Sequence, residues 1–299
     1  MTEPPLDLTR RGPRLLGGGR GLRHDRRQAR GAALSTASTV AVIAVIAALF
    51  LLAPGSAQVR HTFFSPPDLW QSLIGDPAKG YYSVGAAIWL NIRMFLVAEV
   101  LILAFGLLLA IVRQSTGPVM LPLRVVALLY VDVFRGIPTL LVIYAVGFGL
   151  PALSLTVVST QDPAVYGVIA LVLSYSAYVC EVYRAGINSV PLAQVSAARS
   201  VGLTQPQAMR HVILPQAVRT VIPALLNDFI SLQKDTALVS VLGSIEANRA
   251  AEIYSATVFN YSSYVVAAVL FLILTIPLAR FTDHLIARDR ARRLAGGAR

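Results

Sequence analysis

The chain has 299 residues, of which 56% are hydrophobic and only 14% are charged, and its formal net charge is +11. This composition is too apolar for a water-soluble domain and suits several membrane-crossing helices. A single cysteine excludes an intrachain disulfide and a multi-cysteine metal site, and the four histidines lack ligand spacing, so no metal is expected. The arginines flank apolar stretches and do not interleave with aromatic residues, so nucleic acid is not an expected partner.

Two segments precede the first external stretch. Residues 1–35 contain eight arginines with several glycines and prolines, which predicts a disordered, basic cytoplasmic tail. Residues 36–53 are almost wholly apolar and approach the ~20 residues that cross a bilayer, so we expect an additional N-terminal transmembrane helix. A cleaved signal peptide is the alternative. Because the apolar stretch exceeds a usual signal-peptide core and Ala53-Pro54-Gly55 is a poor cleavage site, we expect an uncleaved anchor.

An external loop and a second span follow. Residues 54–84 are polar and contain prolines and aromatic residues that suit a membrane interface. The second span, residues 85–112, carries Asn91, Arg93 and Glu99 in otherwise apolar sequence. In one interpretation, Arg93 reaches the outer interface and Glu99 pairs with another helix; in the other, Glu99 faces a transport pathway.

The third span, residues 125–150, follows a short basic loop and contains the stretch Tyr130 to Pro138. Proline removes a helical N–H and collides with the preceding turn, so Pro138 must kink this helix. Asp132 and Arg135 are three residues apart and share a helical face, so we expect them to form a structural ion pair near the cytoplasmic side; the alternative is a substrate site.

A polar segment, Asn188–Gln216, lies after the fourth span at residues 164–185. In the last turns of that span, Glu181 and Arg184 are expected to pair. In the polar segment, a first helix over 193–200 should end at Gly202. Thr204 and Gln207 have capping-box spacing, which predicts a second helix running to Leu214 before Pro215 interrupts it. Two short helices joined by a glycine turn at the membrane face indicate a cytoplasmic docking loop.

The fifth span, residues 217–243, is the most polar one. At 100° per residue, Asn227, Ser231 and Lys234 form one stripe, and Asp228 and Asp235 form an adjacent one. Polar groups inside a membrane are costly unless they are paired or meet water, so this face should line a pathway or a subunit interface. The alternative is a purely structural pair between Lys234 and one of the two aspartates.

The sixth span, residues 262–279, precedes a basic cytoplasmic tail at 284–299. Twenty of the 26 basic residues fall in segments that would face the cytoplasm in this arrangement, and three fall in external ones. The positive-inside rule therefore places both termini in the cytoplasm of a multi-pass plasma-membrane protein.

Catalytic and nucleotide-binding motifs are not found. Of the two lysines, Lys79 precedes Gly80 and Lys234 precedes Asp235, so the chain has no Gly-Lys-Ser/Thr phosphate loop. It also lacks a Ser/His/Asp or His-Glu-x-x-His arrangement. Any ATP that drives transport must therefore bind to a partner.

Ser196-Ala197-Ala198, Gly202 and Val212 to Pro215 resemble the Glu-Ala-Ala loop of binding-protein-dependent ABC importer permeases. Ser196 stands where the family usually has glutamate, so one polar contact of that loop is missing. The stretches 130–138, 227–230 and 234–236 are similar to those of amino-acid permeases. The resemblance extends from about Ile88 to Arg280.

The resemblance implies an all-α integral membrane protein with six transmembrane helices. A five-helix permease core over 85–283, with its coupling loop at 188–215, would be joined to one extra N-terminal helix. In the family, the loop docks on an ATP-binding subunit, and here the matching residues are Ser196, Ala197, Ala198, Arg199, Gly202 and Leu203. The expected substrate pathway comprises Glu99, Asn227, Asp228, Ser231, Lys234, Asp235 and Thr236.

The implied partners are a pair of ATP-binding subunits, a second permease subunit, an extracytoplasmic solute-binding protein and membrane lipid. ATP and Mg would bind to the ATPase, with no cofactor in this chain, and the expected substrate is a polar amino acid. The competing hypothesis is a secondary amino-acid transporter that ATP does not drive. Such a transporter needs its own ion-coupling site and often an inverted repeat, and it leaves the docking loop unexplained.

Overall fold

A computed structural model describes residues 18–156, 159 and 161–296 of the chain. Within this part, the regular elements are helices, and one isolated antiparallel bridge joins Asp76 to Tyr81. The all-α prediction is therefore confirmed. The contacts divide the chain into two units, residues 1–60 and residues 61–299.

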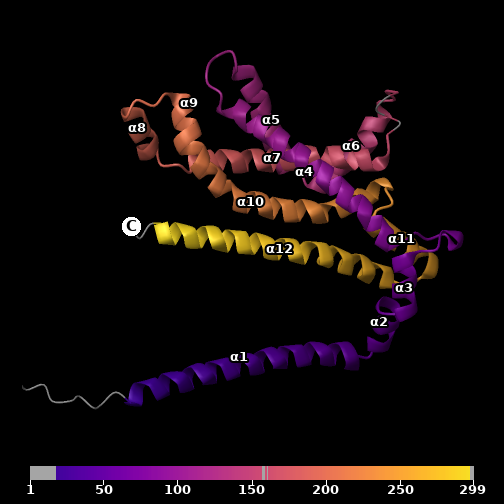
Figure 1. Ribbon diagram of the computed structural model, residues 1–299. Coiled ribbons are helices and arrows are strands. Elements are labelled where there is room, and N and C mark those ends of the chain that lie inside the picture. The colour runs from indigo at the N-terminus through magenta and orange to yellow at the C-terminus, as the bar shows by residue number, and fades with distance from the viewer. Residues whose placement is uncertain (1–17, 157–158, 160, 297–299) are drawn as a thin grey trace, which may run out of the picture. The chain divides into compact units, whose positions relative to one another are not determined.

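The first unit is dominated by helix α1, Gly18–Leu52 (Figure 1). Its segment Ser35–Leu52 is long and apolar enough to cross a membrane, and its large hydrophobic side chains are exposed, as lipid contact requires. Arg60 donates hydrogen bonds to the carbonyls of Phe50 and Leu51 and so closes the end of the helix.

The basic tail is expected to be disordered, but helix α1 begins within it, at Gly18. Residues 1–17 of that tail lie outside the described residues. Extending an existing helix costs far less than nucleating a new one, and alanine and arginine are good helix formers. The apolar span therefore extends its helix backwards into the basic sequence.

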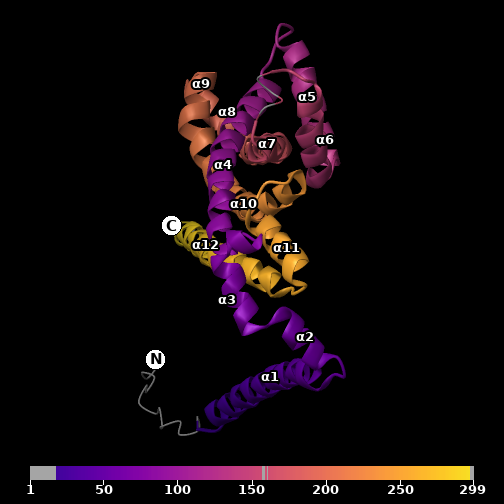
Figure 2. The ribbon, with the colours of Figure 1, turned by 90° about the vertical axis from the view of Figure 1, so that its right-hand side faces the viewer.

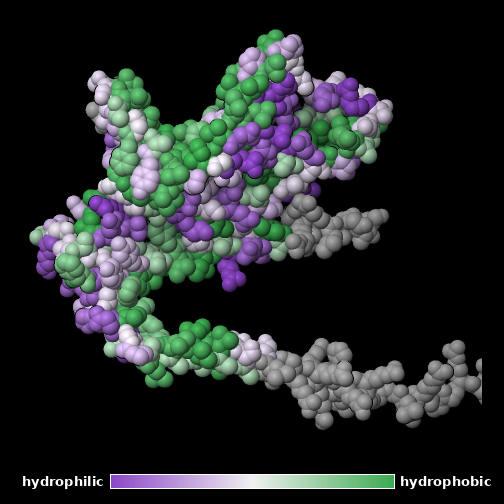
Figure 3. Space-filling view, turned by 180° about the vertical axis from the view of Figure 1, so that it is seen from behind, coloured by the Kyte–Doolittle hydropathy of each residue, from purple (hydrophilic) through white to green (hydrophobic). Residues whose placement is uncertain are grey.

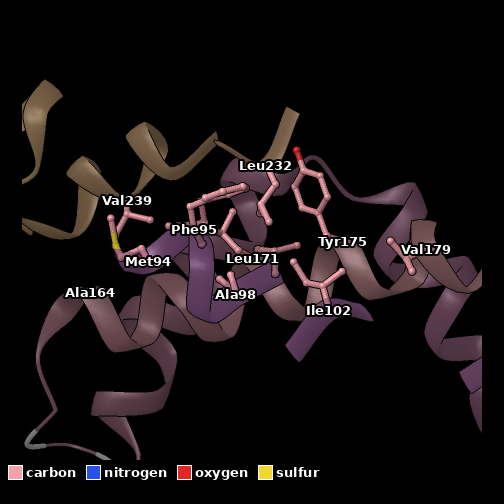
Figure 4. Close-up of a cluster of buried hydrophobic side chains, with 13 residues drawn as sticks. Met94, Phe95, Ala98, Ile102, Ala164, Leu171, Tyr175, Val179, Leu232 and Val239 are labelled. Atoms are coloured by element: carbon pink, nitrogen blue, oxygen red, sulfur yellow. The ribbon is translucent and has the colours of Figure 1, made fainter. Parts of the chain in front are cut away.

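Helices α4, Val84–Gln114, and α7, Pro163–Asn188, form the centre of the second unit (Figures 1 and 2). Their backbones approach closely because Gly106 of α4 faces Val179 of α7, where an added Cβ would lie 2.8 Å from the valine Cγ1. Helix α10, Leu214–Asp235, and the 3-10 helix η3, Thr236–Leu242, complete this core. Its labelled side chains in Figure 4 are Met94, Phe95, Ala98, Ile102, Ala164, Leu171, Tyr175, Val179, Leu232 and Val239.

The remaining helices of this unit pack around that core or extend from it. Helix α12, Ser262–Gly296, contacts α10, and its outer end packs against α3, Pro66–Ile74, and α11, Ala247–Val258. The other elements of this unit are η1 (Pro77–Lys79), α5 (Leu121–Gly136), α6 (Thr139–Ala152), α8 (Leu192–Ser200), α9 (Gln205–Ala208) and the π-helical η2 (Met209–Ile213), and α2 (Ser56–Phe63) contains the boundary between the two units.

Four helices in the described part are long and apolar enough to span a membrane, or five if the bent pair α5 and α6 counts as one span. The expected number is six. Helix α10 is not among them, because its polar residues lower its mean hydropathy. In place of one helix over 217–243, the fifth span consists of α10 and η3, which ends where Gly243 has a φ of +86°.

The third span is broken and not merely kinked. Helices α5 and α6 meet at an angle of 110°, on either side of Ile137 and Pro138. A residue before proline is pushed out of the helical region, and Ile137 is extended, with φ −99° and ψ 130°. Proline thus acts on two consecutive residues, which is enough to end one helix before the next begins.

The expected ion pair between Asp132 and Arg135 does not form. The Arg135 guanidinium carbon lies 5.9 Å from the ring centroid of Tyr178, on α7, and the tyrosine hydroxyl donates to the Arg135 carbonyl at 3.2 Å. Stacking on an aromatic face stabilises a guanidinium where water is scarce. This contact joins the end of α5 to the central helix.

Residues 54–84 and 244–261, both expected to be external loops, contain helices: α2 and α3 in the first and α11 in the second. Tyr254 of α11 is fully buried, and its hydroxyl donates to Asp68 of α3 at 2.7 Å. The ring of Tyr254 also packs edge-on against Tyr81, with 4.8 Å between centroids. These contacts hold α3, α11 and the start of α4 together at one end of the second unit.

The close approach of α7 to η3 predicts a selective cost for an added methyl group. At Gly167, a new Cβ would lie 2.3 Å from Cγ1 of the fully buried Val239, whereas at Gly149 of α6 it would meet nothing within 4 Å. We expect Gly149→Ala to stabilise its helix by up to about 1 kcal/mol. Gly167→Ala should instead destabilise the fold by roughly 1–3 kcal/mol, because a stiff side chain must move. Unfolding in detergent measures the change in stability of both variants. Equal changes in stability in the two variants would refute this packing.

Candidate functional site

The first half of the docking loop is a helix closed by a glycine turn. Helix α8 ends where the N–H of Gly202 donates to the Arg199 carbonyl at 3.0 Å and that of Leu203 donates to the Ala198 carbonyl at 3.2 Å. These two bonds form a Schellman motif, which requires a left-handed residue after the helix. Gly202 has a φ of +89°, as the sequence predicts.

The second half of the loop continues directly into a membrane helix. The Gln207 side chain accepts the backbone N–H of Thr204 at 2.8 Å, which is the expected capping contact. The expected interruption at Pro215 does not occur. Helix α9 passes into the π-helical segment η2, and α10 begins at Leu214 with Pro215 in its first turn. Proline is tolerated there because it has no N–H to satisfy, and the wider π turn adds a residue ahead of it.

One side of the loop packs against the protein and the other is presented outward. Ala198, Ala208 and Ile213 are buried, whereas 82% of Leu192 and 80% of Val201 remain exposed. Hydrophilic side chains gather at this end of the molecule (Figure 3). Of the expected coupling residues, Ala198 is buried and Leu203 is half-buried. The others are exposed: Ser196, Ala197 and Arg199 on α8, and Gly202 in the turn that follows it.

A charged cluster anchors the base of the loop. Glu181 of α7 accepts a hydrogen bond from Arg184 at 3.4 Å, which confirms the expected pair. Glu181 also forms an ion pair with Arg113 at the end of α4. The sequence alone does not indicate Arg113 because the two helix ends meet only in the folded chain. The cluster ties the helix that delivers the loop to the longest helix of the core.

The polar face of α10 carries the expected pathway residues in two groups. Asn227 and Lys234 are exposed, and Ser231 is half-buried between them. On the adjacent face, Asp228 interacts electrostatically with Glu99 of α4. The Asp228 Oδ2 atom is buried and has no hydrogen-bond partner among the described residues.

Asp235 is oriented by a tyrosine and does not pair with a lysine. Its Oδ2 accepts the Tyr175 hydroxyl at 2.8 Å. The four ion pairs of the described residues do not include Lys234, so the alternative of a structural pair with Asp228 or Asp235 is wrong. The polar face of α10 therefore carries carboxylates and an exposed ammonium group that are not paired with each other.

Thr236 lies in a buried polar network. Asn91 of α4 donates to the Thr236 hydroxyl at 3.1 Å and to Glu246 at 2.9 Å, and it accepts the N–H of Ala247 at 3.0 Å. Asn91, Thr236 and Glu246 are at most 1% exposed. In the sequence, the feature that indicates this network is the polar residue Asn91 inside an apolar span.

Glu246 caps the start of α11. Its carboxylate accepts the backbone N–H groups of Asn248 at 2.9 Å and Arg249 at 2.7 Å. Burial raises the pKa of the Glu246 carboxyl above its ordinary value, although these N–H groups and Asn91 favour the ionised form. Sequence analysis missed this residue because glutamate is not a usual N-cap.

The chain matches a known protein family. The family described as "Binding-protein-dependent transport system inner membrane component" matches residues 102–290. The chain belongs to this family. It is therefore the membrane-spanning permease subunit of an ATP-driven importer, and it is not itself the ATPase. A secondary transporter does not fit this family.

Individual proteins match over most of their own length. The chain is 37% identical over 190 residues to the "Probable amino-acid permease protein YxeN" of Bacillus subtilis, covering 62% of this chain and 83% of that protein. Over 198 residues it is 37% identical to the "Probable glutamine ABC transporter permease protein GlnM" of the same organism, covering 64% of this chain and 88% of that one. A solved structure of an amino acid ABC transporter with histidines is 32% identical, with a TM-score of 0.63, covering 69% of this chain and 93% of that one.

The buried carboxyl of Glu246 predicts a pH dependence of stability. Because its pKa is raised in the folded chain, the unfolded chain ionises first, near the ordinary glutamate pKa of about 4.3. The raised pKa of Glu246 stabilises the folded chain fully below that pH. This stabilisation is lost as pH rises through the pKa of Glu246 in the folded chain. Denaturation of the wild type and of Glu246→Gln in detergent across this range should show the wild type losing stability relative to the variant.

Glu252→Gln is the matched control, because Glu252 lies on the same helix and is 48% exposed. The difference in stability between Glu252→Gln and the wild type should not show this dependence on pH. A wild type that gains stability relative to Glu246→Gln as pH rises would contradict the assigned direction of the pKa shift.

Proposed function

We propose that this permease imports a polar amino acid through a pathway formed between the polar face of its α10 and a second permease subunit. One observation carries the proposal. Asn227 and Lys234 are exposed on a helix inside the membrane core of the protein, where contact with lipid would be costly. A second subunit, a homologous or an identical chain, would cover this face and leave a polar passage between the two.

The substrate class follows from the groups on that face. The carboxylates of Asp228 and Asp235 suit an ammonium group, and the ammonium of Lys234 suits a carboxylate, so a zwitterion satisfies both. The names of the relatives point in the same direction, since they refer to amino acids and to glutamine.

The docking loop would couple this passage to ATP hydrolysis. We assign Ser196, Ala197, Ala198, Arg199, Gly202 and Leu203 to the contact with an ATP-binding subunit, which binds ATP and Mg. An extracytoplasmic solute-binding protein would deliver the substrate to the opposite face. Both termini would lie in the cytoplasm, as the distribution of basic residues indicates.

The coupling role of the loop predicts a specific defect for Gly202→Val. A β-branched residue at a φ of +89° is strained by roughly 1–2 kcal/mol, so the turn between α8 and α9 should reorganise. Uptake in proteoliposomes with the ATP-binding subunit should fall about tenfold while the permease remains folded. Gly202→Asn is the control, because asparagine tolerates this conformation. Full uptake by Gly202→Val would show that this loop does not couple transport to ATP hydrolysis.

The pathway role of α10 predicts that Asp235→Asn impairs transport without affecting assembly. The amide oxygen still accepts the Tyr175 hydroxyl, so the substitution removes mainly the charge. A charged hydrogen bond contributes roughly 1.5–3 kcal/mol, so amino-acid uptake should fall on the order of tenfold or more. Tyr175→Phe keeps the charge and should have a smaller effect. Unchanged uptake by Asp235→Asn in an intact complex would place the substrate elsewhere.

A further inference from the structure

Arg93 of α4 is exposed, and its positive charge has no partner within the described part of the chain. The four ion pairs found there do not include Arg93, and its guanidinium makes no hydrogen bond or aromatic contact with a described residue. A cation on a membrane-spanning helix is costly unless an anion or water compensates its charge. An anion that pairs with this guanidinium must therefore come from outside the described residues.

The sequence of α4 places Arg93 at the edge of the hydrocarbon core. Arg113 comes 20 residues after Arg93, which corresponds to about 30 Å along a helix axis and equals the thickness of that core. Between these two arginines, Glu99 is the only charged residue. One turn before Arg93, Trp89 is 57% exposed, and tryptophan favours the boundary between lipid and water. Arg93 and Trp89 therefore lie at the level of the lipid headgroups.

Arg93 also borders an apolar groove between α4 and the start of α7. The groove has a volume of about 390 Å³, and every lining residue other than Arg93 is apolar. Val97 and Leu101 follow Arg93 at intervals of four residues, so they continue along the same side of α4, and Leu101 lies about 12 Å deeper in the bilayer. Val165 and Ile169 of α7 line the opposite wall. The groove thus begins at a cation and continues as an apolar surface.

The groove and the polar face of α10 lie on opposite sides of the contact between α4 and α10. In that contact, the ring of Phe95 packs edge-on against Phe229, with 4.5 Å between centroids. Two residues further along α4, Val97 points about 200° away from Phe95, and Asn227 is turned away from Phe229 in the same manner. A second permease subunit on the polar face of α10 therefore does not fill the groove.

A zwitterionic amino acid does not suit this groove either. Its ammonium group would need an acceptor, and the lining contains no polar or charged side chain besides Arg93. A phospholipid fits better, because its phosphate lies at the headgroup level and its acyl chains extend from there toward the bilayer centre. The planar guanidinium can donate to two phosphate oxygens at once.

We propose that Arg93 and the groove form a binding site for an anionic phospholipid of the surrounding bilayer. The phosphate accepts hydrogen bonds from Arg93, and one acyl chain lies along Val97 and Leu101. A headgroup with a net negative charge neutralises the unpaired guanidinium, whereas a zwitterionic headgroup brings a cation of its own. The site depends neither on the transported substrate nor on the docking loop.

The charge of Arg93 predicts a preference between headgroups. The full-length permease in detergent is titrated with phosphatidylglycerol or phosphatidylcholine carrying the same acyl chains, and native mass spectrometry gives the dissociation constant of the first bound lipid. The wild type should bind phosphatidylglycerol more tightly. Arg93→Gln should weaken this binding roughly tenfold and remove the preference, because a charge-assisted hydrogen bond is lost. Arg280→Gln, which changes an exposed arginine on α12, is the control and should bind like the wild type.

The groove itself is tested by two tryptophan substitutions on α4. Val97→Trp fills the groove and keeps the charge of Arg93, so both lipids should bind at least several-fold more weakly. Leu96→Trp is the matched control, since Leu96 and Val97 are 53% and 54% exposed but Leu96 does not line the groove. Leu96→Trp should therefore bind lipid like the wild type.

Several outcomes would overturn the proposal. Equal binding of phosphatidylglycerol by Arg93→Gln and the wild type would show that Arg93 does not hold the headgroup. Equal losses in Arg93→Gln and Arg280→Gln would indicate a general attraction of basic residues for anionic lipid. Equal effects of Val97→Trp and Leu96→Trp would place the acyl chain outside the groove. If Val97→Trp reduces the dimer in the same spectra and leaves lipid binding unchanged, the groove is occupied by a second copy of the chain.

Discussion

A polar group in the bilayer must be paired or must meet water, and this constraint explains where the polar side chains of the permease lie. Asn91 satisfies it completely, because its amide bonds Thr236, Glu246 and the backbone of Ala247. Gln233 of α10 satisfies it in part: its Oε1 accepts the hydroxyl of Thr275 at 2.7 Å and so links α10 to α12, whereas its buried Nε2 has no hydrogen-bond partner among the described residues. Groups that satisfy the constraint within the chain hold the helices together, and the exposed remainder marks where a partner or a passage must lie.

The central pair α4 and α7 provides a rigid frame for that exposed face. Close approaches at Gly106, Gly147 and Gly167 leave no space for a further methyl group, so helices are held by interlocked side chains and backbone. Gly186 repeats this contact between α7 and α10, where an added Cβ would lie 2.1 Å from Val221 Cγ1. Under the proposed coupling function, movement of α7 at the docking loop would therefore displace α10 directly.

The sequence predicted those features that depend on neighbouring residues. The glycine turn at Gly202, the contact between Gln207 and Thr204 and the pair of Glu181 with Arg184 are local and were found where expected. The expected pair of Asp132 with Arg135 failed because a more distant residue, Tyr178, offered the guanidinium an aromatic face. Arg113 and Glu246 could not be predicted, since their partners come from other helices and only folding brings them together.

The path of the chain through Pro215 links the two halves of the site. Proline alone predicts an interruption, which would separate the docking loop mechanically from the fifth span. The chain instead stays helical from Gln205 to Leu242, with a π segment before the proline and a 3-10 segment after Asp235. The two non-α segments bracket the stripe of Asn227, Ser231 and Lys234. Under the proposed coupling function, rotation or translation of the loop would be transmitted along this continuous helical segment to the polar face. The less regular turns at its two ends are where the segment would bend as the proposed pathway changes from one side of the membrane to the other.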